Sequence, residues 1–260
     1  MAGGYMRKKI RVMISILMLC LMCSVTVSAR AGGGGGSSSG GGGSSHSSTG
    51  HSGSTGSRVE NIAGFLMQWI LIGVSAGGGT FLLLQKAKKA RRKSRQAMAF
   101  FAQMGDNWDA KEIQKQVEEA YFQIQECWRR MDITYGAPYL SEELQMEFNS
   151  KIQWMKVKNE EVIQRNVRLL SAMPVCVQDE PGEEQDVLWY LIHGKMTGYY
   201  IDSTSRQVIR GNTKPEAFFE YWKFVYRNKR WVLREIRQQN EMDIDAFENT
   251  QSNIKKLKGR

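Results

Sequence analysis

Three titratable residues in the C-terminal half of the chain are the candidates for acid–base chemistry. His193 lies between Ile192 and Gly194 in a strand-like run, Asp202 follows at the start of a turn, and Glu220 stands in an aromatic run further on. A carboxylate within reach of a histidine would suit proton transfer of the isomerase or dehydratase type. No spacing in the sequence forces these side chains together, so we expect no catalytic residues, and an enzyme is the alternative with the least support.

Metal and cofactor sites are not indicated either. Cys127 and Cys176 are far apart and belong to no C-x-x-C pair, which argues against a disulfide framework or a zinc site and for two buried, reduced thiols. His46 and His51 lie in a Gly/Ser tract and are read as incidental. With no phosphate-binding glycine loop after a strand, no nucleophile elbow and no ligand pair at helical spacing, we expect neither metal nor cofactor.

The formal charge of +10 is distributed unevenly along the 260 residues. Residues 1–100 contain 13 Lys or Arg and one Asp or Glu, whereas residues 101–260 contain 23 and 25. A nucleic-acid-binding domain needs its basic surface on the folded part. The charge therefore argues against nucleic acid as a partner and places the cations where targeting and membrane topology use them.

The N-terminus has the three parts of a secretory signal peptide. Arg7, Lys8 and Lys9 form a charged region, residues 10–27 are predominantly apolar apart from Arg11, and Val27-Ser28-Ala29 supplies small residues for cleavage after Ala29. We therefore predict a signal peptide over residues 1–29, with an uncleaved first membrane helix as the alternative. Residues 30–60 are rich in Gly and Ser, which is typical of a disordered tether.

Residues 61–85 contain no charged side chain and are long enough to cross a bilayer as a helix. Seven cations follow in the juxtamembrane segment 86–105, namely Lys86, Lys88, Lys89, Arg91, Arg92, Lys93 and Arg95. Such a cluster is a stop-transfer and positive-inside signal, and it attracts anionic lipid. The pattern predicts a single-pass protein of the cell membrane whose C-terminal domain is cytoplasmic.

An aromatic hairpin dominates the remaining sequence. From Phe219 to Arg227 aromatic and β-branched residues alternate, with Trp222, Phe224 and Tyr226 on one face and Phe219, Tyr221 and Val225 on the other. This is a strand pattern, and Asn228-Lys229 suits a two-residue turn into a second arm containing Trp231. A strand that is apolar on both faces must be covered on both faces. The candidate pocket or core residues are Trp222, Phe224, Tyr226, Trp231 and His193.

Two helices precede this sheet. Asp109 and Ser141 each begin a run with helical spacing, and strand-like runs follow at 162–177, 187–201 and around 208–209, with Pro174 marking a bulge, edge or strand end. The fold class predicted is α+β, with two N-terminal helices packed on a strongly bent antiparallel sheet.

The hairpin also carries a resemblance to a known family. Phe219-x-x-Trp222-x-Phe224, Arg227 and Trp231-x-Leu233-x-x-Ile236 resemble the C-terminal domain of the forty-four-kilodalton subunit of the mitochondrial inner-membrane translocase, over roughly 112–237. The resemblance implies a cone-like fold of the nuclear transport factor two type, here residues 106–239, followed by a tail over 240–260.

The resemblance also implies a binding role, because the mitochondrial relatives anchor a chaperone motor or a ribosome to a membrane. We expect a membrane-anchored scaffold module that docks a protein partner, or lipid, at the inner face of the membrane. A small-molecule or lipid-binding protein that uses a cone cavity is the alternative.

Overall fold

The computed structural model describes residues 30–31, 58–103, 107–180 and 182–249, and of residues 58–78 it describes the backbone course only. The predicted signal peptide (1–29), most of the Gly/Ser tether and the end of the tail lie outside the described residues. The predicted span at 61–85 falls mostly on residues 58–78. Among the described residues, no helix is long and apolar enough to cross a membrane.

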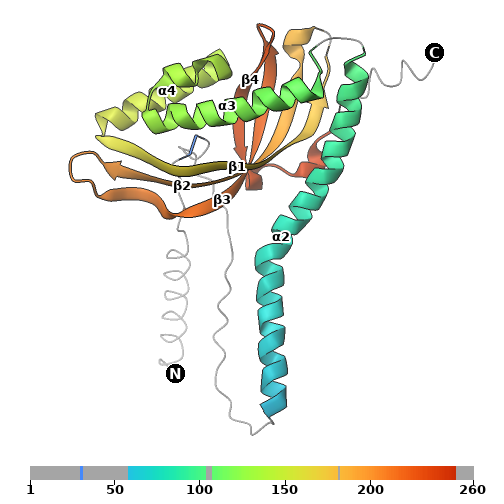
Figure 1. Ribbon diagram of the computed structural model, residues 1–260, viewed down its shortest axis with the longest axis vertical. Helices are drawn as coiled ribbons and strands as arrows, with labels where there is room; N and C mark the ends of the chain where they lie inside the picture. The colour runs from blue at the N-terminus through green and yellow to red at the C-terminus, as the bar shows by residue number, and fades with distance from the viewer. Residues whose placement is uncertain (1–29, 32–57, 104–106, 181, 250–260) are drawn as a thin grey trace, which may run out of the picture.

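Helices pack on a four-stranded antiparallel sheet, which confirms the predicted α+β class (Figure 1). The strands follow one another in the order β1-β2-β3-β4. The main elements are α2 (Arg58–Phe101), α3 (Ala110–Arg130), α4 (Glu142–Val157), β1 (Glu160–Gln178), β2 (Val187–Asp202), β3 (Val208–Arg227) and β4 (Arg230–Gln238). Short 3-10 turns η1 (Ile133–Tyr135), η2 (Ala137–Tyr139), η3 (Glu183–Gln185), η4 (Gln239–Glu241) and η5 (Ile244–Ala246) connect or follow them.

The two helices of the domain begin where their capping residues predict. The Asp109 carboxylate accepts hydrogen bonds from the backbone N–H groups of Lys111 and Glu112, and the Ser141 hydroxyl accepts one from that of Leu144. These side chains satisfy donors that the first helical turn leaves without partners. The backbone N–H of Ser141 also donates to the carbonyl of Leu233, which fixes the start of α4 against β4.

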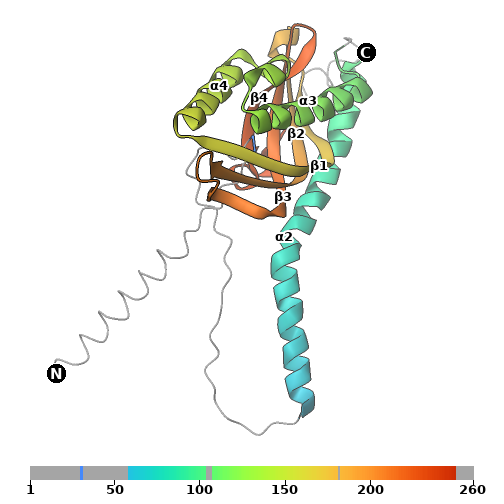
Figure 2. The ribbon, with the colours of Figure 1, turned by 60° about the vertical axis from the view of Figure 1, so that its left-hand side comes forward.

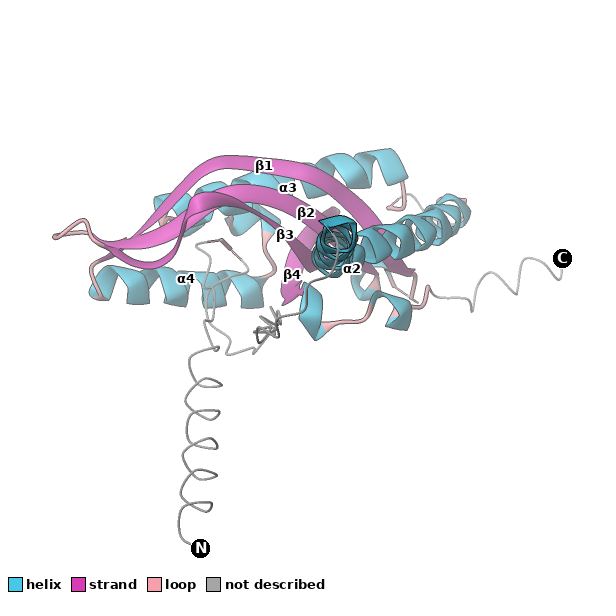
Figure 3. Cartoon of the chain, turned by 90° about the horizontal axis from the view of Figure 1, so that it is seen from below, coloured by secondary structure: helices cyan, strands magenta, loops and turns pink. Residues whose placement is uncertain are grey.

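The sheet is long-stranded and strongly curved (Figure 3). Register shifts interrupt the β1–β2 ladder at three places, one of them between Pro174 and Cys176, as the proline predicts. The hairpin turn is the predicted one: Asn228 and Lys229 have φ of 50° and 61°, the positive values that a type I′ turn requires.

The strand β3 is longer than the sequence suggests. The sequence predicts a turn over 204–211 with only a short strand around 208–209, yet β3 is continuous from Val208 to Arg227 and includes Gly211 and Pro215. Its ladder with β2 has a register shift between Met196 and Gly198, so Pro215 lies where no ladder hydrogen bond is needed. Gly211 and Pro215 are therefore part of one continuous strand, which is bulged where it faces β2.

Both faces of the sheet are covered, as the doubly apolar hairpin predicts. The inner face, which carries Trp222, Phe224 and Leu233, packs against α3 and α4 in the main core. The outer face, which carries Tyr221, Trp189 and Leu191, packs against Leu83 and Ala87 of α2 and against Ile244. The last turns of α2 join the main core, so α2 runs alongside the sheet and contacts both clusters (Figures 1 and 2).

Candidate functional site

The predicted aromatic row fills the interior of the domain. Trp222 and Phe224 are completely buried, and the Trp222 ring lies 5.7 Å from that of Tyr121 on α3. Trp231 packs 5.0 Å from Trp108 and 5.3 Å from Tyr226, and its indole N–H donates to a backbone carbonyl. These four residues of the candidate set join α3, β3 and β4 into one core.

The three candidate acid–base residues do not meet. His193 pairs with Phe219 across the β2–β3 ladder, whereas Ile192 pairs with Glu220, so His193 and Glu220 project from opposite faces of the sheet. The His193 ring stacks on Phe219 at 4.1 Å, and partial burial lowers the pKa of the imidazole. Asp202 caps the following turn through the backbone N–H groups of residues 204 and 205. The isomerase or dehydratase hypothesis required His193 beside one of these carboxylates, and it fails on this geometry.

Glu220 is instead the centre of a polar cluster on the inner face. Its carboxylate is fully buried and accepts hydrogen bonds from the Trp222 indole N–H at 3.0 Å and from the Gln238 side chain at 3.3 Å. Arg30, far away in the sequence, forms an ion pair with it, with Nε 2.6 Å from Oε1. The guanidinium also donates to Gln238 Oε1 at 2.5 Å and lies 4.5 Å above the ring of Phe218.

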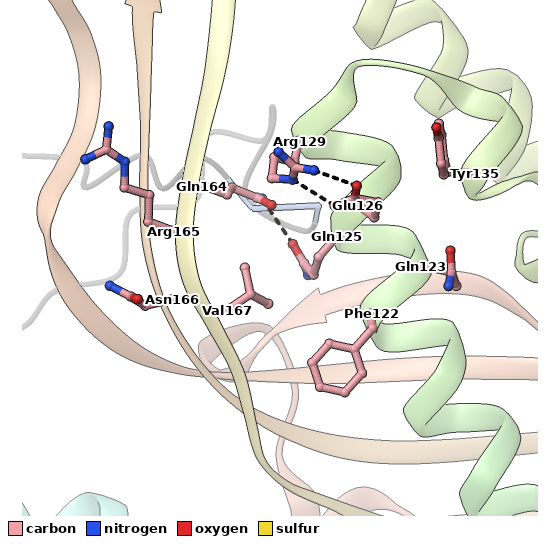
Figure 4. Close-up of a pocket in the computed structure, with 10 residues that line it drawn as sticks. All are labelled: Phe122, Gln123, Gln125, Glu126, Arg129, Tyr135, Gln164, Arg165, Asn166 and Val167. Atoms are coloured by element: carbon pink, nitrogen blue, oxygen red, sulfur yellow. Dashed lines mark hydrogen bonds and ion pairs between the residues drawn. The ribbon is translucent and has the colours of Figure 1, made fainter.

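A groove of about 700 Å³ opens between α3 and β1 (Figure 4). Its lining combines the exposed ring of Phe122 with the polar side chains of Gln125, Gln164 and Arg165. Gln164 donates a hydrogen bond to Gln125 at 3.2 Å, and the buried Nε2 of Gln125 has no hydrogen-bond partner. The groove therefore holds a buried amide donor that an acceptor could satisfy.

One rim of this groove is fixed by charge. Arg129 donates two hydrogen bonds to Glu126, at 2.7 and 2.6 Å, and Arg130 donates a third. These bonds lower the pKa of the Glu126 carboxyl to about 2. The rim is a compact pair of cations around one anion, and it carries a net positive charge.

The cationic segment of α2 presents most of its charges to solvent. Lys86, Lys88, Lys89, Arg92, Lys93 and Arg95 are exposed, and Arg91 is half-buried. Between them, small residues at helical spacing turn toward the sheet, including Ala87 and Ser94, both completely buried. Lys86 pairs with Asp245, and hydrogen bonding to this carboxylate raises the pKa of Lys86. The segment predicted as juxtamembrane is thus also a packed element of the domain.

The first part of the tail closes the outer face. Phe247 packs 5.3 Å from both Trp189 and Tyr221, and the Asn249 side chain accepts a hydrogen bond from the backbone N–H of Val177 at 2.8 Å. These contacts hold the segment after β4 between α2 and the sheet. The sequence prediction for this segment, a tail over 240–260, gives no sign of them.

Sequence reasoning did not find the residues around Glu220. Arg30 is a single cation ahead of a Gly/Ser tract, and Gln238 is an ordinary polar residue of a strand. The one available signal was Glu220 itself, an acidic residue within an otherwise aromatic strand face. A carboxylate in that position needs a partner, and the sequence does not say which.

Comparison with known proteins identifies the domain. A family model described as the Tim44-like domain matches residues 94–238, which confirms the resemblance found in the hairpin. The match begins inside the cationic segment of α2. No curated protein matches the chain. Among solved structures, the intermembrane space region of the chloroplast protein ARC6 has a TM-score of 0.35 at 7% identity, covering 48% of this chain and 97% of that one.

Proposed function

The chain belongs to the family of Tim44-like domains, and from this premise we propose that it is a membrane-anchored docking module. In this proposal the N-terminal half of α2 spans the cell membrane once. The curved sheet and its helices form a cone-like domain at the cytoplasmic face, where the domain binds a protein partner. The family membership supports a binding role, and the separation of His193 from Glu220 removes the acid–base site that an enzyme of the proposed type would need.

The course of α2 is the observation that carries the proposal. One helix of 44 residues runs from the uncharged segment into the cations and on into the core of the domain. Just before the cations, Phe81 and Leu82 are 61% and 58% exposed, whereas Leu83 already packs on the outer face of the sheet. Exposed apolar side chains that are followed by cations are the pattern expected where a helix passes from the hydrocarbon core of a bilayer into its headgroup region.

The exposed cations give the domain a second attachment. Each Lys or Arg near an anionic surface contributes about 1 kcal/mol of attraction. Six exposed cations lie on the part of α2 that packs against the sheet, so the domain sits directly against the headgroups in this proposal, without a flexible spacer.

A docking surface for a protein is available on α4. Met146 and Trp154 are 64% and 60% exposed, and Val157 continues the same side of the helix at a spacing of three residues. Exposed tryptophan flanked by apolar residues is typical of the centre of a protein interface. The buried side of α4, with Phe148 and Ile152, is used by the core, so the exposed side is free for a partner.

Two measurements on intact membranes test the proposal. A Met146→Cys variant labelled with a membrane-impermeant maleimide should react only when the cytoplasmic face is opened. Labelling from the outside would refute the orientation. A photo-crosslinking amino acid at position 154 should capture a protein, whereas one at exposed Lys115 on α3 serves as the control. Equal capture at both positions would refute α4 as the docking surface.

A further inference from the structure

The inner face of the sheet holds a buried carboxylate within a fixed frame. Phe218, Glu220 and Trp222 occupy alternate positions of β3 and therefore share one face. Gln238 lies directly opposite Glu220 on β4. An ionised carboxylate without a counter-charge is costly to bury, so we expect a cation to bind beside Glu220.

The contacts around Glu220 suit a guanidinium specifically. The indole N–H of Trp222 holds one carboxylate oxygen, so the other is directed to Arg30. Arg30 uses Nε for Glu220 and Nη2 for Gln238, and its Cζ lies over the Phe218 ring. An ammonium group has neither the two-pronged donor geometry nor the flat face for this ring contact, so lysine is a poor substitute.

The absence of a side chain at Gly194 leaves the space that the Phe218 ring occupies. A Cβ on Gly194, which pairs with Phe218, would lie 2.4 Å from Cζ of that ring and 2.7 Å from the hydroxyl oxygen of Tyr121. Glycine at 194 therefore lets the Phe218 ring take the position under the guanidinium. The next residue of the bound segment, Ala31, is only 2% exposed and belongs to the main core cluster, so a small side chain fits there.

The residue that follows Arg30 points to a polypeptide ligand. Charge recognition at Glu220, together with the buried side chain of Ala31 in the main core cluster, favours a peptide over a free cation.

We infer that the inner face of the sheet is an arginine-binding site for a polypeptide segment with arginine followed by a small residue, and that its occupant in this structure is the chain's own Arg30–Ala31. Arg30 directly follows the predicted cleavage point at Ala29. If residues 61–85 span the membrane, Arg30 and the domain lie on opposite sides. Under the proposed function, the inserted protein then offers the site to an arginine-bearing partner.

Peptide binding to the purified full-length chain in detergent tests the site without reference to the membrane. The probe is a fluorescein-labelled peptide with the sequence of residues 27–33. It should bind the Arg30→Ala variant at least tenfold more tightly than the wild type, whose own Arg30 competes. The same peptide with lysine in place of arginine should bind at least tenfold more weakly. Equal affinity of the two peptides, or no binding to Arg30→Ala, would overturn the inference.

Two further variants in the Arg30→Ala background locate the site. Glu220→Gln should abolish peptide binding, whereas Glu235→Gln on β4, which removes the same charge from an ion pair with Arg237, should leave it unchanged. If Glu220→Gln fails to fold, Gln238→Ala replaces it and should weaken binding at least threefold. Added peptide should also restore the melting temperature that Arg30→Ala loses. Binding that survives both Glu220→Gln and Gln238→Ala would refute this location, whatever the membrane topology proves to be.

Discussion

At the scale of single residues, the absence of a side chain at Gly194 allows the side chains of Phe218 and Tyr121 to pack against the backbone of β2. Gly194→Ala would place a Cβ 2.4 Å from the Phe218 ring and 2.7 Å from the Tyr121 hydroxyl, so one of the two side chains must shift. Overpacking of this kind costs about 1–3 kcal/mol. We expect the free energy of unfolding in denaturant to fall by that amount.

Gly79 provides the matched control for this substitution. It lies in α2, and a Cβ there would have no neighbour within 4 Å. Gly79→Ala should therefore be neutral or stabilise the helix by up to about 1 kcal/mol. If both alanine variants changed the unfolding free energy equally, the close approach at Gly194 would not be what requires glycine.

The two thiols of the domain predict a loss of stability in alkali. Burial raises the pKa of Cys127 to about 11 and that of Cys176 to about 12, from an ordinary value of 9.0. Because each folded-state pKa is raised, the stabilisation is complete below pH 9 and is lost as the pH rises from 9 through the folded values. Chemical unfolding of the wild type should show stability falling above pH 9, with a shallower fall for Cys176→Ala. An identical slope in the variant would contradict this assignment.

At the scale of elements, the packing of α2 depends on small side chains. Ala97 is buried among core residues and Ala99, two positions on, is exposed. Ala97→Leu should push the helix away from the sheet and lower the unfolding free energy by about 1–3 kcal/mol. Ala99→Leu adds the same volume on the solvent side and should change it by less than about 0.5 kcal/mol. Equal losses in thermal or denaturant unfolding would show that α2 does not pack through this stripe.

Elements whose signals are local could be predicted from the sequence. Asp109 and Ser141 cap their helices, and Asn228-Lys229 turns the hairpin, because each acts on backbone groups within three residues. The two-sided covering of β3 followed from its composition alone. The continuity of β3 through Gly211 and Pro215 did not, because it depends on pairing with β2 on both sides of Pro215, which local turn preference does not reveal.

The candidate site lay beyond such reasoning for a related physical reason. The partners of Glu220 come from Arg30 and Gln238, which are 190 and 18 residues away in the sequence. Likewise, the buried stripe of α2 consists of small residues such as Ala87 and Ser94 between lysines and arginines, so the cations dominate the pattern. Contacts of this kind depend on the tertiary arrangement, which hydrophobic periodicity does not specify.

At the scale of the whole molecule, the six exposed cations of α2 should determine orientation. Replacing Lys86, Lys88, Lys89, Arg92, Lys93 and Arg95 together with glutamine removes the positive-inside signal and leaves the buried stripe intact. We expect a mixed topology, measured as labelling of Met146→Cys from both sides of the membrane. Replacing six exposed polar residues of α3 and α4 in the same way should leave labelling one-sided. Unchanged orientation in the glutamine variant would mean that other residues set the topology.

The unbroken course of α2 has a geometric consequence for the arginine-binding site. An α-helix turns by about 100° and rises by about 1.5 Å for each residue. A single residue inserted just before Leu83 would therefore swing the whole domain by roughly a quarter of a circle about the helix axis, while changing its height very little. In the proposed topology, the number of residues in α2 would therefore set the direction in which the arginine-binding site faces within the plane of the bilayer. A one-residue insertion would turn the site away from a partner embedded in the same bilayer.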